Sequence, residues 1–180
     1  MSVRLETVRT WLRPVVPDDA AFLVELGRAS NVDRYLGGPA DVATEEARLV
    51  AEQAHWLEAG WGLFLVIDRM TTLAIGYTGF IASKSEYDGD PELVCALAEP
   101  YRGQHLGLEV CTAVINWALR ERGLPQVVAC VSVANTDAVG LIRRLGMVRR
   151  GYRPFTRNGV DEEVFTLGAE WQKGGEQRSF

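Results

Sequence analysis

The stretch that decides the fold is "LAEPYRGQHLGLEV", residues 97–110. It ends the nearly continuous apolar run 91–100, which predicts a strand buried on both faces, and enters the longest predicted helix, residues 105–122. The first turn of a helix leaves backbone N–H groups without partners, and a glycine such as Gly103 lets a ligand approach the backbone. The stretch therefore predicts either a phosphate-binding turn or a plain turn before a helix.

The segments around this junction predict an α/β domain with a mixed sheet. Strand–helix–strand over 91–133 requires one right-handed parallel crossover inside an otherwise antiparallel sheet. Thr44 is expected to cap the second helix, Gly60 to stop it, and "RNG" at 157–159 to join the last two strands. Strands are predicted at 8–16, 61–68, 72–83, 91–100, 126–133, 147–155 and 160–171, and helices at 17–30, 44–60, 105–122 and 135–146.

Length and charge limit the kind of protein this is. The chain has 180 residues, which predicts one domain over 1–172 and a frayed tail over 173–180. A net charge of −5 argues against a general nucleic-acid or anionic-membrane binder. No apolar run reaches the length of a membrane span, and the charged N-terminus lacks the apolar core of a secretory signal. We expect a cytoplasmic protein.

The cysteines and histidines argue against metal chemistry. Cys95, Cys111 and Cys130 are widely spaced in apolar runs, which suits reduced, buried thiols. Only His55 and His105 are available as imidazole ligands, so no metal site is predicted.

Four segments in order resemble one protein family. "PYRGQHLGLEV" resembles the acyl-CoA pyrophosphate loop, Arg/Gln-x-x-Gly-x-Gly/Ala, of the GNAT superfamily of N-acetyltransferases. "TWLRPVVPDDAAFLVEL", "VDRYLGGP" and "VANTDAVGLIRRLGM" are similar to segments of its RimJ/RimL-like branch. The resemblance implies the α/β (α+β) GNAT fold: a mostly antiparallel mixed sheet of 6–7 strands, about four helices and one splayed parallel strand pair. It also implies acetyl-CoA as cofactor and allows a homodimer.

Two positions depart from the family pattern. His105 replaces the first glycine of the loop's Gly-x-Gly/Ala pair, and Ala138 stands where the branch often has a serine proposed to protonate the leaving thiolate. Because a residue at a helix start usually has negative φ, we expect His105 to crowd the phosphate without straining the backbone. Its ring then tilts outward or donates to a phosphate oxygen; a solvent-facing side chain fits equally well.

The resemblance assigns cofactor binding to the loop and to the strand before it. Backbone near Leu97 and Ala98 would pair with the pantetheine amides, and Arg102 would donate to phosphate. Small side chains at Ala96, Ala98, Ala129 and Ser132 leave room for a slender ligand. The full predicted cofactor set is Leu97, Ala98, Arg102, Gly103, Gln104, His105, Leu106, Gly107 and Asn135.

Catalysis is assigned to three residues. Glu92 matches a glutamate of the branch and is predicted to act as the base, although a surface strand-end glutamate is the plain alternative. Asn135 would bind cofactor or a catalytic water, and it can also cap a helix. Tyr152 is a candidate proton donor or a sheet-face aromatic. Glu109 is interpreted as structural.

The resemblance implies an N-acetyltransferase that moves an acetyl group from acetyl-CoA to a primary amine, either a protein N-terminus or a small molecule. The acceptor site is expected in the early helices, including residues 35–38, where the resembling branch builds it. Six arginines at 143–157 favour a solvated helix face and edge strand, with contact to an adenosine 3′-phosphate or an acidic substrate as the alternative. A catalytically weak acyl-CoA-binding sensor and an unrelated α/β nucleotide binder are the rival functions.

Overall fold

A computed structural model of the chain describes residues 3–28, 41–83, 89–153 and 161–168. Its strands are β1 (Leu5–Glu6), β2 (Thr10–Pro14), β3 (Leu63–Asp68), β4 (Ala74–Ala82), β5 (Pro91–Leu97), β6 (Gln126–Ser132), β7 (Val148–Arg153) and β8 (Glu162–Gly168). Its helices are η1 (Pro17–Asp19), α1 (Ala20–Arg28), α3 (Val42–Ala59), η2 (Glu99–Tyr101), α4 (Leu106–Asn116), η3 (Trp117–Glu121) and α5 (Thr136–Arg144).

All the described strands form one sheet in the order β1-β2-β3-β4-β5-β6-β8-β7. Its paired neighbours run antiparallel except β5 and β6, which are parallel, so the predicted crossover is confirmed. The sheet has one strand more than predicted because the two-residue β1 pairs with β2. The short segment carries no periodic signal of its own. Strand β8 lies between β6 and β7.

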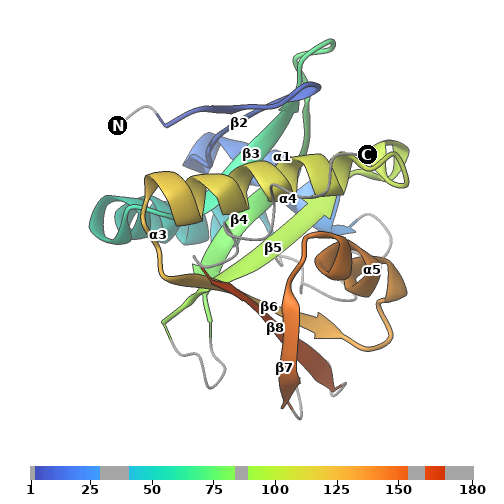
Figure 1. The fold of residues 1–180 in the computed structure, drawn as a ribbon. Coiled ribbons are helices and arrows are strands. Elements are labelled where there is room, and N and C mark those ends of the chain that lie inside the picture. The colour runs from blue at the N-terminus through green and yellow to red at the C-terminus, as the bar shows by residue number, and fades with distance from the viewer. Residues whose placement is uncertain (1–2, 29–40, 84–88, 154–160, 169–180) are drawn as a thin grey trace.

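Helices cover both faces of the sheet. Figure 1 shows α4 lying across the front of the sheet, with α1 and α3 behind it. The larger core lies under α4, where Val110 and Val114 pack with Phe80 and Val127 from the strands. A smaller core on the opposite face joins α1 and α3 to β3 through Leu23, Leu49 and Leu65. The alternating strand positions thus serve two cores.

Aromatic side chains fill the core beneath the end of α4. The rings of Trp56, Phe64 and Trp117 lie 5.0–5.6 Å apart, and Trp61 is 7% exposed. The start of the predicted strand 61–68 therefore belongs to the core. The predicted helix 105–122 is confirmed in extent, but its last five residues, η3, form a π-helix.

The N-terminal cap of α3 differs from prediction. Asp41, not Thr44, caps α3, because the Asp41 carboxylate accepts the backbone N–H of Thr44 at 2.9 Å. Gly60 ends the helix with φ 75°, as predicted. Most predicted strands overrun the observed ones at their ends, as 8–16 does against Thr10–Pro14. The turn at 157–159, the tail 173–180 and residues 35–38 lie outside the described residues.

The three cysteines are free thiols, and Cys111 is the most deeply buried of them. No helix in the described ranges combines the length and apolar character needed to cross a bilayer. Within those same ranges, no group of histidine, cysteine, aspartate or glutamate side chains could hold a metal ion.

Candidate active site

The turn between β5 and α4 holds two residues in the left-handed region. Gly103 has φ 71° and His105 has φ 60°. The prediction of a negative φ at His105 is therefore wrong: the residue precedes the first helical turn as its N-cap and does not yet have helical geometry. A non-glycine residue there costs about 1–2 kcal/mol of backbone strain. A glycine at this position would avoid the strain.

Side chains fix the shape of this turn. The Arg102 Nε donates to the carbonyl of Leu97 at 2.7 Å, so this N–H closes the turn and is not directed to a ligand. The Gln104 amide donates to the carbonyl of Pro100 at 2.8 Å. In addition, Arg9 Nη1 donates to the Gln104 carbonyl at 3.1 Å. The turn is thus held from β5 and from the β1–β2 hairpin.

Glu109 completes this anchor. Its carboxylate accepts the backbone N–H of Arg9 at 2.8 Å and the Arg9 Nε at 2.7 Å. Hydrogen bonds from Thr7 and Arg9 lower the pKa of Glu109, although burial acts in the opposite direction. This agrees with the structural role predicted for Glu109.

At the start of α4, the groups available to a ligand are mainly backbone N–H groups. The Leu106 side chain is buried, so it can offer a ligand only its N–H. A Cβ added at Gly103 would meet no atom within 4 Å, which leaves the turn open on that side. A Cβ added at Gly107 would lie 3.6 Å from the Leu141 side chain, so Gly107 marks the close approach of α5. The turn fits a phosphate bound by backbone N–H groups.

Strands β5 and β6 diverge beside this turn. Within the described chain they pair at one position, Glu92 with Val128. Ala98 donates its N–H to the Ile75 carbonyl of β4 at 2.8 Å. Because backbone groups alternate between the two edges of a strand, those of Leu97 face β6 and the gap. Leu97 is thus the better placed of the two residues predicted to pair with pantetheine, and it would do so through its N–H, because its carbonyl accepts the Arg102 Nε.

Glu92 lies at the vertex where the two strands part. It is nearly buried, and Ser83 and Cys130 hydrogen-bond its carboxylate. Arg153 Nη1 is 3.9 Å from its Oε2. Burial raises the pKa of Glu92 above that of an ordinary glutamate, although the charge of Arg153 and the two hydrogen bonds oppose the shift. Such a carboxylate accepts a proton more readily than an ordinary glutamate does.

No pattern in the sequence predicts which residues surround Glu92. Burial, followed by the charge of Glu92, raises the pKa of the Cys130 thiol to about 12, so the thiol stays protonated. Arg153 was noted only as part of an arginine-rich run, and Ser83 and Glu162 carried no signal. Their approach depends on the order β6-β8-β7, which local pattern did not predict.

Asn135 caps α5, as its plain interpretation predicted. Its Oδ1 accepts the backbone N–H of Ala138 at 3.2 Å. The cap sits at the end of the β6–α5 connection, beyond the diverging part of β6.

Tyr152 lies apart from Glu92. It pairs with Glu163 across β7 and β8, whereas Arg153 pairs with Glu162. Since side chains alternate along a strand, Tyr152 and Arg153 lie on opposite faces of the sheet. The structure therefore does not bring Tyr152 together with the predicted base.

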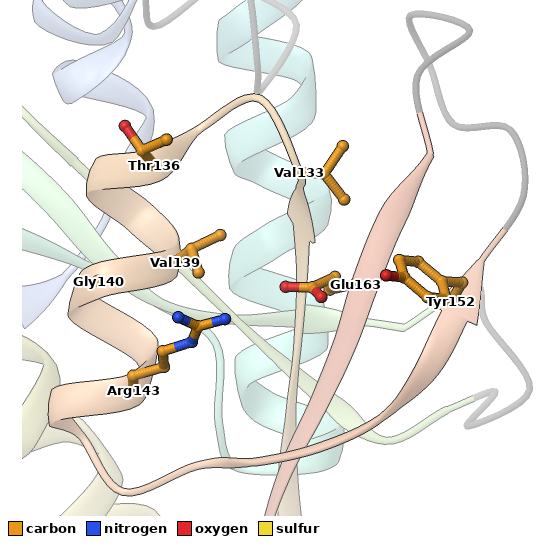
Figure 2. A pocket seen from close by; sticks show the side chains of 7 residues that line it. All are labelled: Val133, Thr136, Val139, Gly140, Arg143, Tyr152 and Glu163. Carbon is orange, nitrogen blue, oxygen red and sulfur yellow. The ribbon is translucent and has the colours of Figure 1, made fainter.

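Tyr152 lines a separate hollow of about 360 Å³, which Figure 2 shows between α5 and strands β7 and β8. Leu141 and Ile142, on the other side of α5, pack into the core with α4. The helix thus separates the hollow from the β5–α4 turn. The lining residues are Val133, Thr136, Val139, Gly140, Arg143, Tyr152 and Glu163.

The arginine-rich run is largely used within the sheet. Arg149 pairs with Glu163 at 2.7 Å, Arg150 donates to the Thr166 hydroxyl at 2.8 Å, and Arg153 pairs with Glu162. This supports the structural interpretation of these three arginines. Arg157 lies outside the described residues.

The geometry defines a class of α/β protein: a mixed sheet in which one pair among the described strands is parallel and opens beside a glycine-containing turn at a helix start. Residues 9–148 match the acetyltransferase (GNAT) domain family. The chain belongs to this family, a family of acyltransferases that transfer acetyl from acetyl-CoA, and the resemblance seen in its motifs is confirmed.

Solved structures share the fold over almost their whole length. A GNAT-family acetyltransferase from Bordetella pertussis is 23% identical, with TM-score 0.79 over 92% of this chain and 99% of that one. The ribosomal-protein-S5-alanine acetyltransferase from Vibrio fischeri is 16% identical, with TM-score 0.79 over 93% and 97%. RimL, a ribosomal L7/L12 alpha-N-protein acetyltransferase in complex with coenzyme A, is 13% identical, with TM-score 0.80 over 92% and 98%.

Proposed function

We propose that this protein is a cytoplasmic N-acetyltransferase that transfers an acetyl group from acetyl-CoA directly to a primary amine. The observation that carries the proposal is the nearly buried carboxylate of Glu92 at the vertex of the β5–β6 gap, with a raised pKa. Membership of the GNAT family supplies the class of reaction.

The residues around the gap fit acetyl-CoA. Backbone N–H groups of Gly103 to Gly107 would hold the pyrophosphate, and the exposed edge of β5 at Leu97 would hold the pantetheine. Asn135, at the start of α5, would approach the same ligand. When bound, acetyl-CoA supplies the thioester carbonyl and the thiol leaving group.

Glu92 would prepare the amine. An ammonium ion has no lone pair for attack, so a base must first remove one of its protons. The Glu92 carboxylate can do so directly or through a water molecule. Its raised pKa brings the proton affinity of the base closer to that of its substrate, which favours proton transfer at neutral pH.

The acceptor is a protein N-terminus or a small-molecule amine. Two of the similar structures are named as acetyltransferases of ribosomal proteins, which supports the first choice. The segment 35–38, where the acceptor site was expected, lies outside the described residues.

A catalytically weak acyl-CoA sensor is the second candidate. The strained His105 in the turn and the alanine at 138 favour it. Thiol release from acetyl-CoA, measured with a panel of N-terminal peptides, polyamines and aminoglycosides, separates the two. An enzyme gives amine-dependent thiol release and an acetylated amine by mass spectrometry. Acetyl-CoA binding with no release above the amine-free rate for any member would identify a sensor.

A further inference from the structure

A chain of three charged side chains crosses the sheet on the face opposite α4. Arg153, from the outer strand β7, donates to Glu162 Oε2 of β8 through Nε at 3.1 Å and Nη2 at 2.5 Å. Its Nη1 lies 3.9 Å from Glu92 Oε2 of β5. The side chains of Arg153, Glu162 and Glu92 are 23%, 14% and 11% exposed. The chain is therefore largely shielded from solvent.

Arg153 reaches across the part of the sheet where β5 and β6 begin to separate. Strands β6 and β8 lie between β5 and β7, and adjacent strands are about 4.8 Å apart. Only a long side chain can reach from β7 toward β5. Because β5 and β6 share a single backbone pair, at Glu92, the arginine adds a side-chain connection at the same point.

We propose that Arg153 is a positioning residue for the acetyl transfer proposed above: it holds the carboxylate of Glu92 at the vertex of the gap, and Glu162 anchors the arginine. The inference rests on the proposed role of Glu92 as the base. Arg153 touches neither cofactor nor acceptor in this account. It acts through Glu92.

The groups around Glu92 act on its protonation in opposite directions. Arg153 from β7 favours the carboxylate, as do hydrogen bonds from Ser83, which follows β4, and Cys130 of β6. Glu162 of β8 disfavours it, as does burial, the largest influence. Loss of the arginine should therefore raise the pKa of Glu92. Loss of the Glu162 charge should lower it, because one repulsion disappears and Arg153 is free to approach Glu92.

The protein offers a matched control pair on the other face of strands β7 and β8. Arg149 of β7 pairs with Glu163 of β8 at 2.7 Å, in the same kind of contact. Glu163 faces the hollow beside α5, as Figure 2 shows, and not the gap that holds Glu92. Arg149→Met therefore removes a similar ion pair and leaves Arg153, Glu162 and Glu92 in place.

The test compares Arg153→Met, Arg153→Lys, Glu162→Gln and Arg149→Met with the unmodified protein. One measurement is the pH dependence of kcat/KM for thiol release. The other is the titration of the Glu92 carboxyl by ¹³C NMR in glutamate-labelled protein, with its signal assigned from Glu92→Gln. The second measurement needs no turnover, so it keeps its meaning if Glu92 proves not to be the base.

We expect Arg153→Met to move the acid limb of kcat/KM and the Glu92 titration to higher pH, with a loss of rate on the acid limb of roughly tenfold for each pH unit of displacement, which disappears on the alkaline side. Arg153→Lys should restore most of the loss. Glu162→Gln should move both curves to lower pH, and Arg149→Met should move neither.

Two results would overturn the proposal. One is an unchanged Glu92 titration in Arg153→Met, or a change no larger than that in Arg149→Met. The other is a shift to higher pH in Glu162→Gln. If Arg153→Met does not fold, the direction of the Glu162→Gln shift decides. Shifted titrations without any matching change in the rate profile would instead refute Glu92 as the base while leaving the charge chain intact.

Discussion

Glu92 and Glu109 each lie beside an arginine, yet the two sites treat their carboxylates differently. Glu109, near the start of α4, accepts two hydrogen bonds from Arg9, at 2.7 and 2.8 Å. Glu92, at the vertex of the gap, has its guanidinium nitrogen 3.9 Å away, on an arginine already bonded to Glu162. Glu109 is thus held as a charged carboxylate with a structural role, whereas the carboxylate of Glu92 remains able to accept a proton.

The pKa directions follow from this geometry. Direct hydrogen bonds outweigh burial at Glu109 and lower its pKa. At Glu92 burial outweighs the more distant charge and raises the pKa. An arginine beside a glutamate therefore does not identify an ion pair whose purpose is stability. The number and length of the hydrogen bonds decide between structure and chemistry.

The largest expected effect separates the two glutamates by turnover. Glu92→Gln should lower kcat about 100-fold or more near pH 7, because a general base contributes about 10²–10⁴ in rate. Glu109→Gln should leave kcat close to that of the unmodified protein. Both are measured as thiol release at saturating acetyl-CoA and amine. An equal loss in the two variants would mean that Glu92 supports structure as Glu109 does.

The next effect concerns stability: substitution of Glu109 and substitution of Glu92 should change the free energy of unfolding in opposite directions. Glu109→Gln should lower the free energy of unfolding at pH 7 by about 1 kcal/mol, roughly 3 °C in Tm. Because the folded protein holds the pKa of Glu109 down, this stabilisation exists at neutral pH and is lost as pH falls through the folded-state pKa.

Glu92→Gln should instead raise Tm at neutral pH. The raised pKa means that ionised Glu92 opposes folding at neutral pH, so the gain should fade as pH falls through the folded-state pKa of Glu92 and be absent below the pKa of an unfolded glutamate. Thermal unfolding from pH 4 to pH 8 measures both variants. A lower Tm for Glu92→Gln at neutral pH would show that its ion pair outweighs its burial.

The smallest effects concern the turn anchored by Glu109. Gly103→Ala should cost about 1 kcal/mol, because φ is 71° there although the space for a Cβ is open. His105→Gly should be neutral or stabilising by up to about 1 kcal/mol, since strain is relieved while the unfolded chain gains freedom. Urea unfolding measures both. Destabilisation by His105→Gly would mean that the freedom gained by the unfolded chain, or a contact of the imidazole, outweighs the relief of strain.

Much of the fold followed from local pattern. The apolar run of β5, the turn at Gly103 and the length of α4 predicted the strand–turn–helix junction, and the chain order predicted the parallel pair. Asn135 as a cap and Glu109 as a structural residue were also predicted. These features depend on residues close together in sequence or on a repeating period.

The rest depended on pairing between distant segments. The left-handed φ of His105 was not predicted because the sequence placed the residue inside the helix, whereas it lies one residue before the helix, in a turn that contacts from Arg9, Arg102 and Gln104 hold. Tyr152 and Arg153 are adjacent in sequence, and only the register of β7 on β8 decides which one faces Glu92. A shift by one residue would exchange their faces.

The central claim is that the turn at 102–107 holds acetyl-CoA, and thermal unfolding with and without this ligand tests it most directly, with ATP as the control. Binding at ~100 times the dissociation constant adds about 2.7 kcal/mol to the folded state, or roughly 5–10 °C in Tm for a domain of this size. We predict that shift with acetyl-CoA and none with ATP. No shift at millimolar acetyl-CoA, or an equal shift with ATP, would contradict it.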